Sequence, residues 1–197
     1  QEFKIKKVTI GQERFLQYDG TIEVPENRDM VGSRILKLPV RIFKSTGSAK
    51  KEAVFYLDGG PGNTNISGTT NAALLRERDL VFVGYRGVDG STVLNSKSLY
   101  RAMTGLTHPL LGDASLDTIT SVMKSYFGNL DQQGIDITLY TMTDVIDDVE
   151  EVRKTLGYGK IHLLSFSYGT RLALMYCLRY PESVSRVVLA GANPPGH

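Results

Sequence analysis

The sequence contains a single cysteine, Cys177, so it can form neither an internal disulfide nor a cysteine-based metal cluster. It has no apolar run near the roughly 18 residues that a membrane-spanning helix requires. The sequence also lacks a large excess of charge of either sign, because its 23 Lys and Arg residues nearly balance its 21 Asp and Glu residues and leave a net charge of +2. That balance gives no indication of binding to nucleic acid or to an anionic membrane surface.

The composition is that of an ordinary globular domain, with 41% apolar and 22% charged residues. A chain of 197 residues is long enough for one domain with a substantial core. No internal repeat, low-complexity tract or interdomain linker is visible. We therefore expect residues 1–197 to belong to a single domain.

Two kinds of strand pattern follow one another along the chain. Alternating stretches at 20–25 and 35–43, separated by a turn-rich segment, predict an antiparallel hairpin at a sheet edge. Later apolar runs are short and nearly continuous, which is typical of strands covered on both faces. These runs lie at 53–57, 80–83, 161–166 and 186–190.

Helical patterns separate most of these runs. The clearest covers about 143–156, where Thr141 and Asp144 resemble a capping box and Gly157 is placed to end the helix. Further helices are expected over about 115–130 and from just after Ser167 to Tyr180. Strands that alternate with helices predict an α/β fold, a mainly parallel sheet with an antiparallel N-terminal edge.

The helix over 143–156 carries a cluster of acidic residues. We expect this cluster to be the solvated face of the helix rather than a metal site. Its members are Asp144, Asp147, Asp148, Glu150 and Glu151.

The strongest chemical signal is the run Ser-Phe-Ser-Tyr-Gly at 165–169, between an apolar strand and a helix. This is the context of a nucleophile elbow, a sharp strand-to-helix turn that exposes the central serine above the sheet. Small residues are needed two places on either side of that serine, and Gly169 meets this need while Ser165 replaces the usual glycine. We predict Ser167 as a catalytic nucleophile; the alternative is a Ser/Gly turn without catalytic meaning.

A second signal, Asp-Gly-Gly-Pro-Gly at 58–62, directly follows the first buried strand. Consecutive glycines let backbone amides approach a substrate oxygen. In proteins with a nucleophile elbow, such a loop supplies one amide of the oxyanion hole. The residue after the nucleophile supplies the other, so we predict the amides of Gly60 and Tyr168 as the pair. Taken alone, the loop would better fit a tight turn that ends a strand, but two motifs in the right order favour the functional interpretation. The residues expected to support the site are Gly59, Pro61, Gly62 and Gly169.

A third glycine-rich turn, at 84–91, has neither the G-x-G-x-x-G spacing nor the lysine of a phosphate-binding loop. We interpret it as structural, and the sequence predicts no metal ion and no cofactor.

The acid and the histidine of such a site should follow the serine in chain order. After Ser167 the chain has no aspartate, one glutamate, Glu182, for which we expect a solvated role, and one histidine, His197, the final residue. His162 lies within a predicted strand and His108 in an unassigned loop. The sequence therefore predicts an incomplete triad, and little or no hydrolase activity for these 197 residues alone.

On these residues the chain resembles the proline iminopeptidase and tripeptidyl aminopeptidase group of α/β-hydrolases. The likeness is carried by Leu-Asp-Gly-Gly-Pro-Gly at 57–62, by 79–87, and most specifically by 144–191. Gly-Thr-Ile-Glu-Val-Pro at 20–25 also resembles the start of the tripeptidyl aminopeptidase subgroup.

The sequence departs from the pattern of that group in three places. Asp58 stands where the group usually has histidine or asparagine, Gly84-Tyr85 replaces Asp-Gln before Arg-Gly, and Ser165 replaces the first elbow glycine. The resemblance implies a helical cap, then the acid and histidine, beyond the strand at 186–190. On this reading, residues 1–197 are the N-terminal part of one α/β-hydrolase domain that lacks the cap and the C-terminal strands.

The function that the resemblance implies is hydrolysis through an acyl-enzyme, with release of N-terminal residues from peptides as the first choice. A carboxylesterase or thioesterase acting on small acyl compounds is the alternative, and a non-catalytic fragment or binding module is a third. The expected partner is a small peptide or acyl substrate, not nucleic acid. We also expect the edge at Val187–Leu189, in the strand at 186–190, to be covered by a complementing C-terminal chain, the rest of the same protein, or by a neighbouring copy.

Overall fold

The computed structural model describes residues 2–47, 52–68 and 70–193. The chain divides into two compact units, of which unit 1 comprises residues 1–93 and 141–197 and unit 2 comprises residues 94–140.

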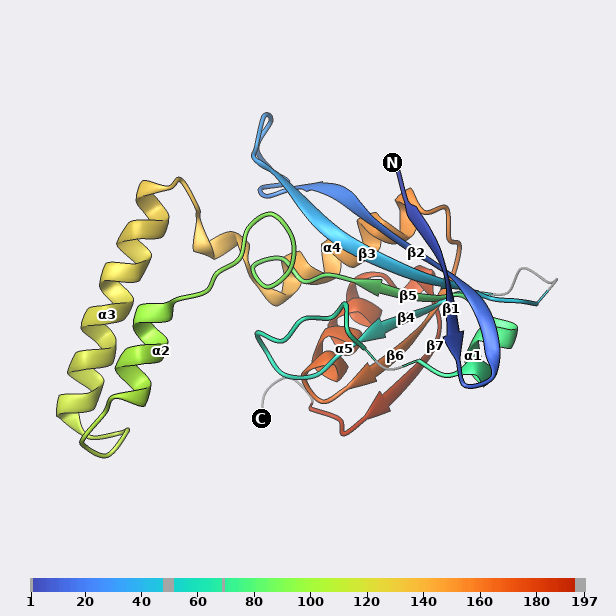
Figure 1. The fold of residues 1–197 in the computed structure, drawn as a ribbon. Coiled ribbons are helices and arrows are strands. Elements are labelled where there is room, and N and C mark those ends of the chain that lie inside the picture. Colours follow the sequence, from blue (N-terminus) through green and yellow to red (C-terminus); the bar gives the residue numbers. More distant parts are fainter. Residues whose placement is uncertain (1, 48–51, 69, 194–197) are drawn as a thin grey trace. The chain divides into compact units, whose positions relative to one another are not determined.

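Unit 1 is built on a seven-stranded sheet (Figure 1). In chain order its strands are β1 (Lys4–Ile10), β2 (Glu13–Pro25), β3 (Ile35–Lys44), β4 (Val54–Leu57), β5 (Leu80–Val83), β6 (Ile161–Phe166) and β7 (Val184–Ala190). Their order across the sheet is β1-β2-β3-β5-β4-β6-β7. The pairs from β1 to β5 are antiparallel, whereas β5, β4, β6 and β7 run parallel.

The predicted α/β class, the antiparallel hairpin and the four apolar strands are therefore confirmed. Strand β1 was not predicted from the sequence. It pairs with β2 and forms the edge, so that the predicted hairpin of β2 and β3 lies inside the sheet and continues into β5.

The helices of unit 1 are α1 (Ala72–Glu77), α4 (Met142–Thr155) and α5 (Tyr168–Arg179), with a 3₁₀ turn at Pro181–Ser183. The predicted capping box is present, since the Thr141 hydroxyl accepts from the Asp144 amide and the Asp144 carboxylate accepts from the Thr141 amide. Gly157, with φ of 71°, follows the end of α4 and allows the chain to leave the helix.

Unit 2 holds α2 (Lys97–Thr104), α3 (Asp113–Gln132) and a 3₁₀ turn at Ile137–Leu139. The helix predicted over 115–130 is α3, and α2 was not predicted.

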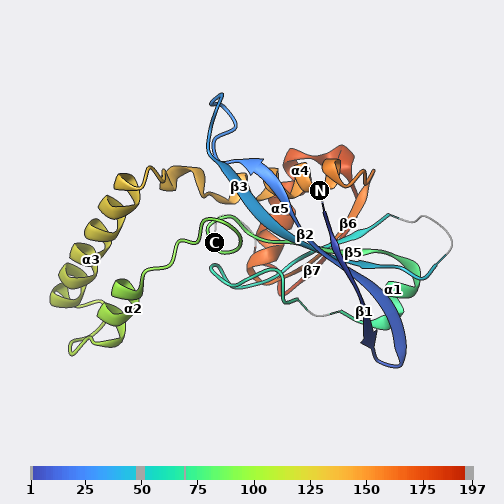
Figure 2. The same ribbon diagram turned by 45° about the horizontal axis from the view of Figure 1, so that its top comes forward.

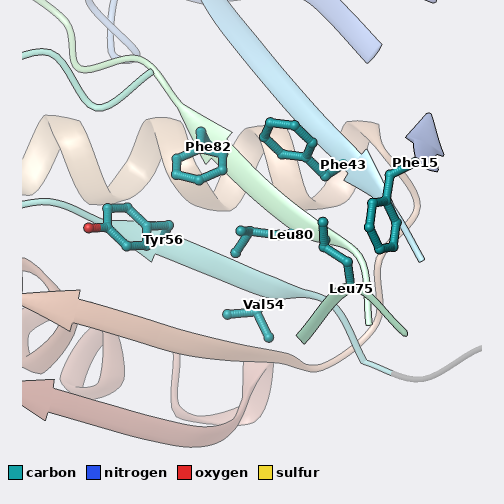
Figure 3. Packing of buried hydrophobic residues seen from close by; sticks show 7 residues of the cluster. All are labelled: Phe15, Phe43, Val54, Tyr56, Leu75, Leu80 and Phe82. Atoms are coloured by element: carbon teal, nitrogen blue, oxygen red, sulfur yellow. The ribbon is translucent and has the colours of Figure 1, made fainter. Parts of the chain in front are cut away.

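Every residue of the central strands β4 and β5 is buried, because helices cover both faces of the sheet there. Figure 2 shows α4 and α5 on one side of the sheet and α1 on the other. On the α1 side lies a cluster of mostly aromatic residues (Figure 3), whose members are Phe15, Phe43, Val54, Tyr56, Leu75, Leu80 and Phe82. Side chains alternate across a strand, so Phe55 and Leu57 face the opposite side.

The expectation that the strand at 186–190 is covered on both faces is wrong for the described residues. No residue of β7 is buried, and Val188 is 55% exposed. Strand β7 is the outer strand of the sheet and pairs with β6 alone among the described strands. Its free edge is where the predicted complementing chain or copy would bind, and that binding stays a prediction.

The expectation of a solvated acidic face on α4 is also wrong, for two of its five residues. Asp148 is 1% exposed and Glu150 is 4% exposed. Asp148 is buried because Arg86, whose own side chain is fully buried, donates two hydrogen bonds of 2.7 Å to its carboxylate. Glu150 accepts from Arg153 and from the Tyr176 hydroxyl at 2.6 Å. Burial of a carboxylate is tolerated where such partners replace its water.

Candidate active site

Ser167 lies between β6 and α5, in a backbone conformation that few residues adopt. Its φ is 47° and its ψ is −119°, and in the described part of the chain it is the one non-glycine residue with positive φ. Such a conformation costs about 1–3 kcal/mol and persists only where the surroundings enforce it. Here the Ser167 amide donates to the Ala190 carbonyl at 2.9 Å, which ties the turn to the end of β7. Ser167 itself is exposed.

Two glycines flank Ser167 because a side chain would have no room. A Cβ atom at position 169 would lie 2.1 Å from the Leu57 carbonyl oxygen, so the start of α5 packs directly on the end of β4. A Cβ atom at position 59 would lie 2.9 Å from the Ser167 Cβ and 3.6 Å from its Oγ. The loop after β4 and the turn after β6 are thus in direct contact, as expected for the ends of adjacent parallel strands.

The rest of the glycine-rich loop forms a β-turn. The Asn63 amide donates to the Gly60 carbonyl at 3.0 Å, with Pro61 and Gly62 as the central residues. Gly62 has φ of 87°, which fits a type II turn, where proline precedes a residue with positive φ.

The amides of this loop and of the turn after β6 differ in what they bind. The Gly59 amide is occupied, because it donates to the Asp58 carboxylate at 2.7 Å. The Tyr168 amide opens α5 and has no acceptor inside the helix. The pairing of the Gly60 and Tyr168 amides as an oxyanion hole stays a prediction.

The replaced elbow residue, Ser165, is fully buried in β6. Its hydroxyl donates to the Val188 carbonyl at 2.8 Å, so the added polar group is satisfied by the neighbouring strand β7. Tyr85, which stands in the replaced pair before Arg86, is buried as well, and its hydroxyl donates to the Asp58 carbonyl at 3.4 Å. Burial, together with the charge of Asp58, raises the pKa of Tyr85 well above its ordinary value, so the hydroxyl keeps its proton.

Two further residues beside the loop were not singled out from the sequence. Asn65 is fully buried, and its side chain accepts from the Asp58 amide at 2.8 Å and donates to the Tyr56 and Val83 carbonyls at 3.0 and 2.8 Å. Asp89 accepts from the amides of Asn65 and Tyr85. Single polar residues in or after glycine-rich turns are common in sequences, so nothing in the sequence distinguished Asn65 or Asp89.

None of the three histidines is assigned as the catalytic base. His162 stands at the start of β6, at the opposite end of that strand from Ser167. Both its ring nitrogens are buried without a hydrogen-bond partner, and burial lowers its pKa. His108 belongs to unit 2 and is exposed, while His197 lies outside the described residues. Glu182 is exposed, as expected for a solvated residue.

Within residues 2–47, 52–68 and 70–193, no group of three or more His, Cys, Asp or Glu side chains is arranged to hold a metal ion. None of the helices in these ranges is both long enough and apolar enough to cross a membrane. Cys177, in α5, is half-buried, and burial raises the pKa of its thiol.

Comparison with known proteins agrees with this architecture. The chain is 29% identical over 190 residues to the serine protease Hip1 of Mycobacterium tuberculosis, which covers 89% of this chain and 36% of that protein. It is 25% identical over 189 residues to a tripeptidyl aminopeptidase of Streptomyces lividans, covering 89% of this chain and 35% of the relative. A proline iminopeptidase of Lactobacillus delbrueckii is 43% identical over 54 residues, which are 27% of this chain and 18% of that enzyme.

The chain thus spans little more than a third of the length of the relatives that match most of it. A family model described as the alpha/beta hydrolase fold matches residues 52–197, which include β4 to β7, the glycine-rich loop and Ser167. This chain belongs to the α/β-hydrolase family.

Proposed function

We propose that this chain carries the nucleophile and the oxyanion hole of a serine hydrolase that releases N-terminal residues from peptides. The observation that carries the proposal is the strained backbone of Ser167, in direct contact with Gly59 of the loop after β4. A strain of this kind, at an exposed serine above the ends of parallel strands, is what a nucleophile elbow requires.

The proposed chemistry is acyl transfer. The Ser167 Oγ attacks the carbonyl carbon of the scissile amide, the C–N bond breaks, and the hydroxyl proton passes through a general base to the leaving amine. Water then hydrolyses the ester and regenerates Ser167. The amides of Gly60 and Tyr168 are proposed to hold the oxygen that becomes negative in each step. The general base and its acid are not assigned to residues of this chain.

The choice of substrate class rests on the relatives. Two matching proteins bear the names tripeptidyl aminopeptidase and proline iminopeptidase, and a third is named a serine protease. We propose that the full-length protein containing this chain likewise cleaves peptides near a free N-terminus.

A fluorophosphonate probe, which reacts with activated serines, tests the nucleophile on the full-length protein. We expect labelling of the wild type and none of Ser167→Ala. The control is Ser185→Ala, an exposed serine of β7, which should be labelled like the wild type. Labelling of Ser167→Ala to the wild-type level would show that the nucleophile is another residue.

The substrate class is tested with pairs of tripeptide p-nitroanilides that differ only in an acetylated N-terminus. An enzyme that recognises a free N-terminus hydrolyses the unblocked member much faster. Equal rates for both members, or hydrolysis of acyl esters alone, would contradict the proposed aminopeptidase activity but not the proposed serine hydrolase mechanism.

A further inference from the structure

We propose that Asn65, supported by Asp89, is a positioning residue that holds the oxyanion loop of residues 58–60 in place against Ser167. The proposal rests on the proposed function, since it assigns how one part of that site is kept in position.

The Asn65 side chain joins three separate backbone segments. Its oxygen accepts from the Asp58 amide, at the first residue of the loop, and its nitrogen donates to the Tyr56 carbonyl in β4 and the Val83 carbonyl at the end of β5. Both donors and one acceptor of the amide group are therefore in use, and the residue is fully buried. Three bonds from one rigid, planar group fix the point at which the chain leaves β4.

Asp89 fixes Asn65 in turn. Its carboxylate accepts from the backbone amides of Asn65, at 3.2 Å, and Tyr85, at 2.9 Å. It also accepts from the Thr64 hydroxyl at 2.5 Å. The turn after β5 is thereby joined to the segment that follows the glycine-rich loop. Together the two side chains connect the ends of β4 and β5.

The loop needs such support because its own glycines provide none. Gly59 lies against Ser167, and any shift of the loop changes the distance from the next amide, Gly60, to the reacting oxygen. Removing one oxyanion donor costs about 10²- to 10³-fold in turnover, and a misplacement of about 1 Å can cost 10²-fold. Turnover should therefore fall less when the loop is loosened but its amides are still present than when one oxyanion donor is deleted.

The test uses the full-length protein with Asn65→Ala. We expect kcat to fall by about 10- to 100-fold while KM changes little, because the loop binds the transition state more strongly than the ground state. Affinity for a boronic acid transition-state analogue should fall by a similar factor.

The control is Tyr176→Phe, which removes a buried hydrogen bond to Glu150 between α5 and α4. It reports how far a general loss of stability lowers kcat. If Asn65→Ala and Tyr176→Phe lower kcat by the same factor at equal folded fraction, Asn65 has no positioning role and the proposal is wrong.

Asp89→Ala provides a second variant if Asn65→Ala fails to fold. It leaves the Asn65 side chain intact and removes the acceptor of the Asn65 and Tyr85 backbone amides and of the Thr64 hydroxyl, so kcat should fall in the same direction by a smaller factor. Unchanged kcat and unchanged analogue affinity in Asp89→Ala would overturn the role of Asp89.

Hydrogen–deuterium exchange separates a failure of this inference from a failure of the proposed function. In Asn65→Ala the Asp58 amide, having lost its acceptor, and the neighbouring Gly59 and Gly60 amides should exchange faster. This readout needs no turnover, so unchanged exchange overturns the inference even in an active enzyme. Loss of labelling in Ser167→Ala bears on the proposed function alone.

Discussion

Gly169→Ala is the substitution for which the structure makes the most definite statement about the elbow. The added methyl group would lie 2.1 Å from the Leu57 carbonyl oxygen, 2.6 Å from the Leu57 carbonyl carbon and 2.7 Å from the Asp58 carbonyl oxygen. Non-bonded atoms normally keep about 3.5 Å or more between them, so α5 and β4 must separate by about 1 Å. All three atoms belong to the backbone, so no side-chain rotation can relieve the contact.

The expected cost follows from that geometry. Overpacking a core typically costs about 1–3 kcal/mol, and a contact with rigid backbone belongs at the upper end of that range. For a domain of about 150–250 residues, about 3 kcal/mol corresponds to a fall of about 6–12 °C in the melting temperature. Moving the start of α5 also moves the Tyr168 amide, which is proposed to bind the oxyanion, so kcat of the full-length protein should fall by about 10²-fold in the folded fraction.

Thermal unfolding followed by circular dichroism measures the stability of this variant. The matched control is Gly128→Ala, at an exposed position inside α3 where a Cβ atom would meet nothing within 4 Å. That change should stabilise by about 0.5–1 kcal/mol, since alanine favours the helix. If Gly169→Ala melts at or above the wild-type temperature, the packing of α5 on β4 described here is incorrect.

Two further predictions concern a buried charge and the backbone strain. Arg86→Met removes the bidentate partner of the buried Asp148 carboxylate, which keeps a bond from Arg28, and should destabilise by about 3 kcal/mol in urea unfolding, the lower end of the range for a broken buried pair. Arg76→Met, which removes an exposed pair with Glu13, should leave the midpoint near the wild type. Ser167→Gly should be more stable than Ser167→Ala by about 1 kcal/mol. Glycine relieves about 1–3 kcal/mol of backbone strain at this position, which exceeds its entropic cost of about 0.5–1 kcal/mol. Equal stabilities of the two variants would show that the turn is not strained.

Local patterns were enough to predict much of this fold. The strands around the site appeared as short apolar runs, and α4 was marked by its period, its capping box and Gly157. The strand-turn-helix context of Ser167 was visible for the same reason, since each signal lies within a few residues of chain. That the two glycine-containing motifs lie together was predicted from the oxyanion hole that such a pair of motifs forms around a nucleophile elbow.

Long-range pairing could not be read in this way. Asp148 stands three residues after Val145 and four before Val152, so the helical period already placed it on the buried face of α4. Its partner, Arg86, is 62 residues away, and the sequence gave no sign of that contact. Likewise, the apolar run in β7 predicted coverage on both faces, but a local pattern cannot tell what lies beside a strand.

The three departures from the peptidase group's sequence pattern lie in three different segments: Ser165 in the elbow, Asp58 in the loop of residues 58–60 and Tyr85 in the turn after β5. Each of these side chains makes a hydrogen bond near the site. The Asp58 carboxylate accepts from the Gly59 amide, the Tyr85 hydroxyl donates to the Asp58 carbonyl, and the Ser165 hydroxyl donates to the Val188 carbonyl. Two of these bonds hold the loop and the third ties the elbow strand to β7. Since none of the three side chains replaces an amide proposed to bind the oxyanion, the substitutions alter how the site is supported and leave its proposed chemistry unchanged.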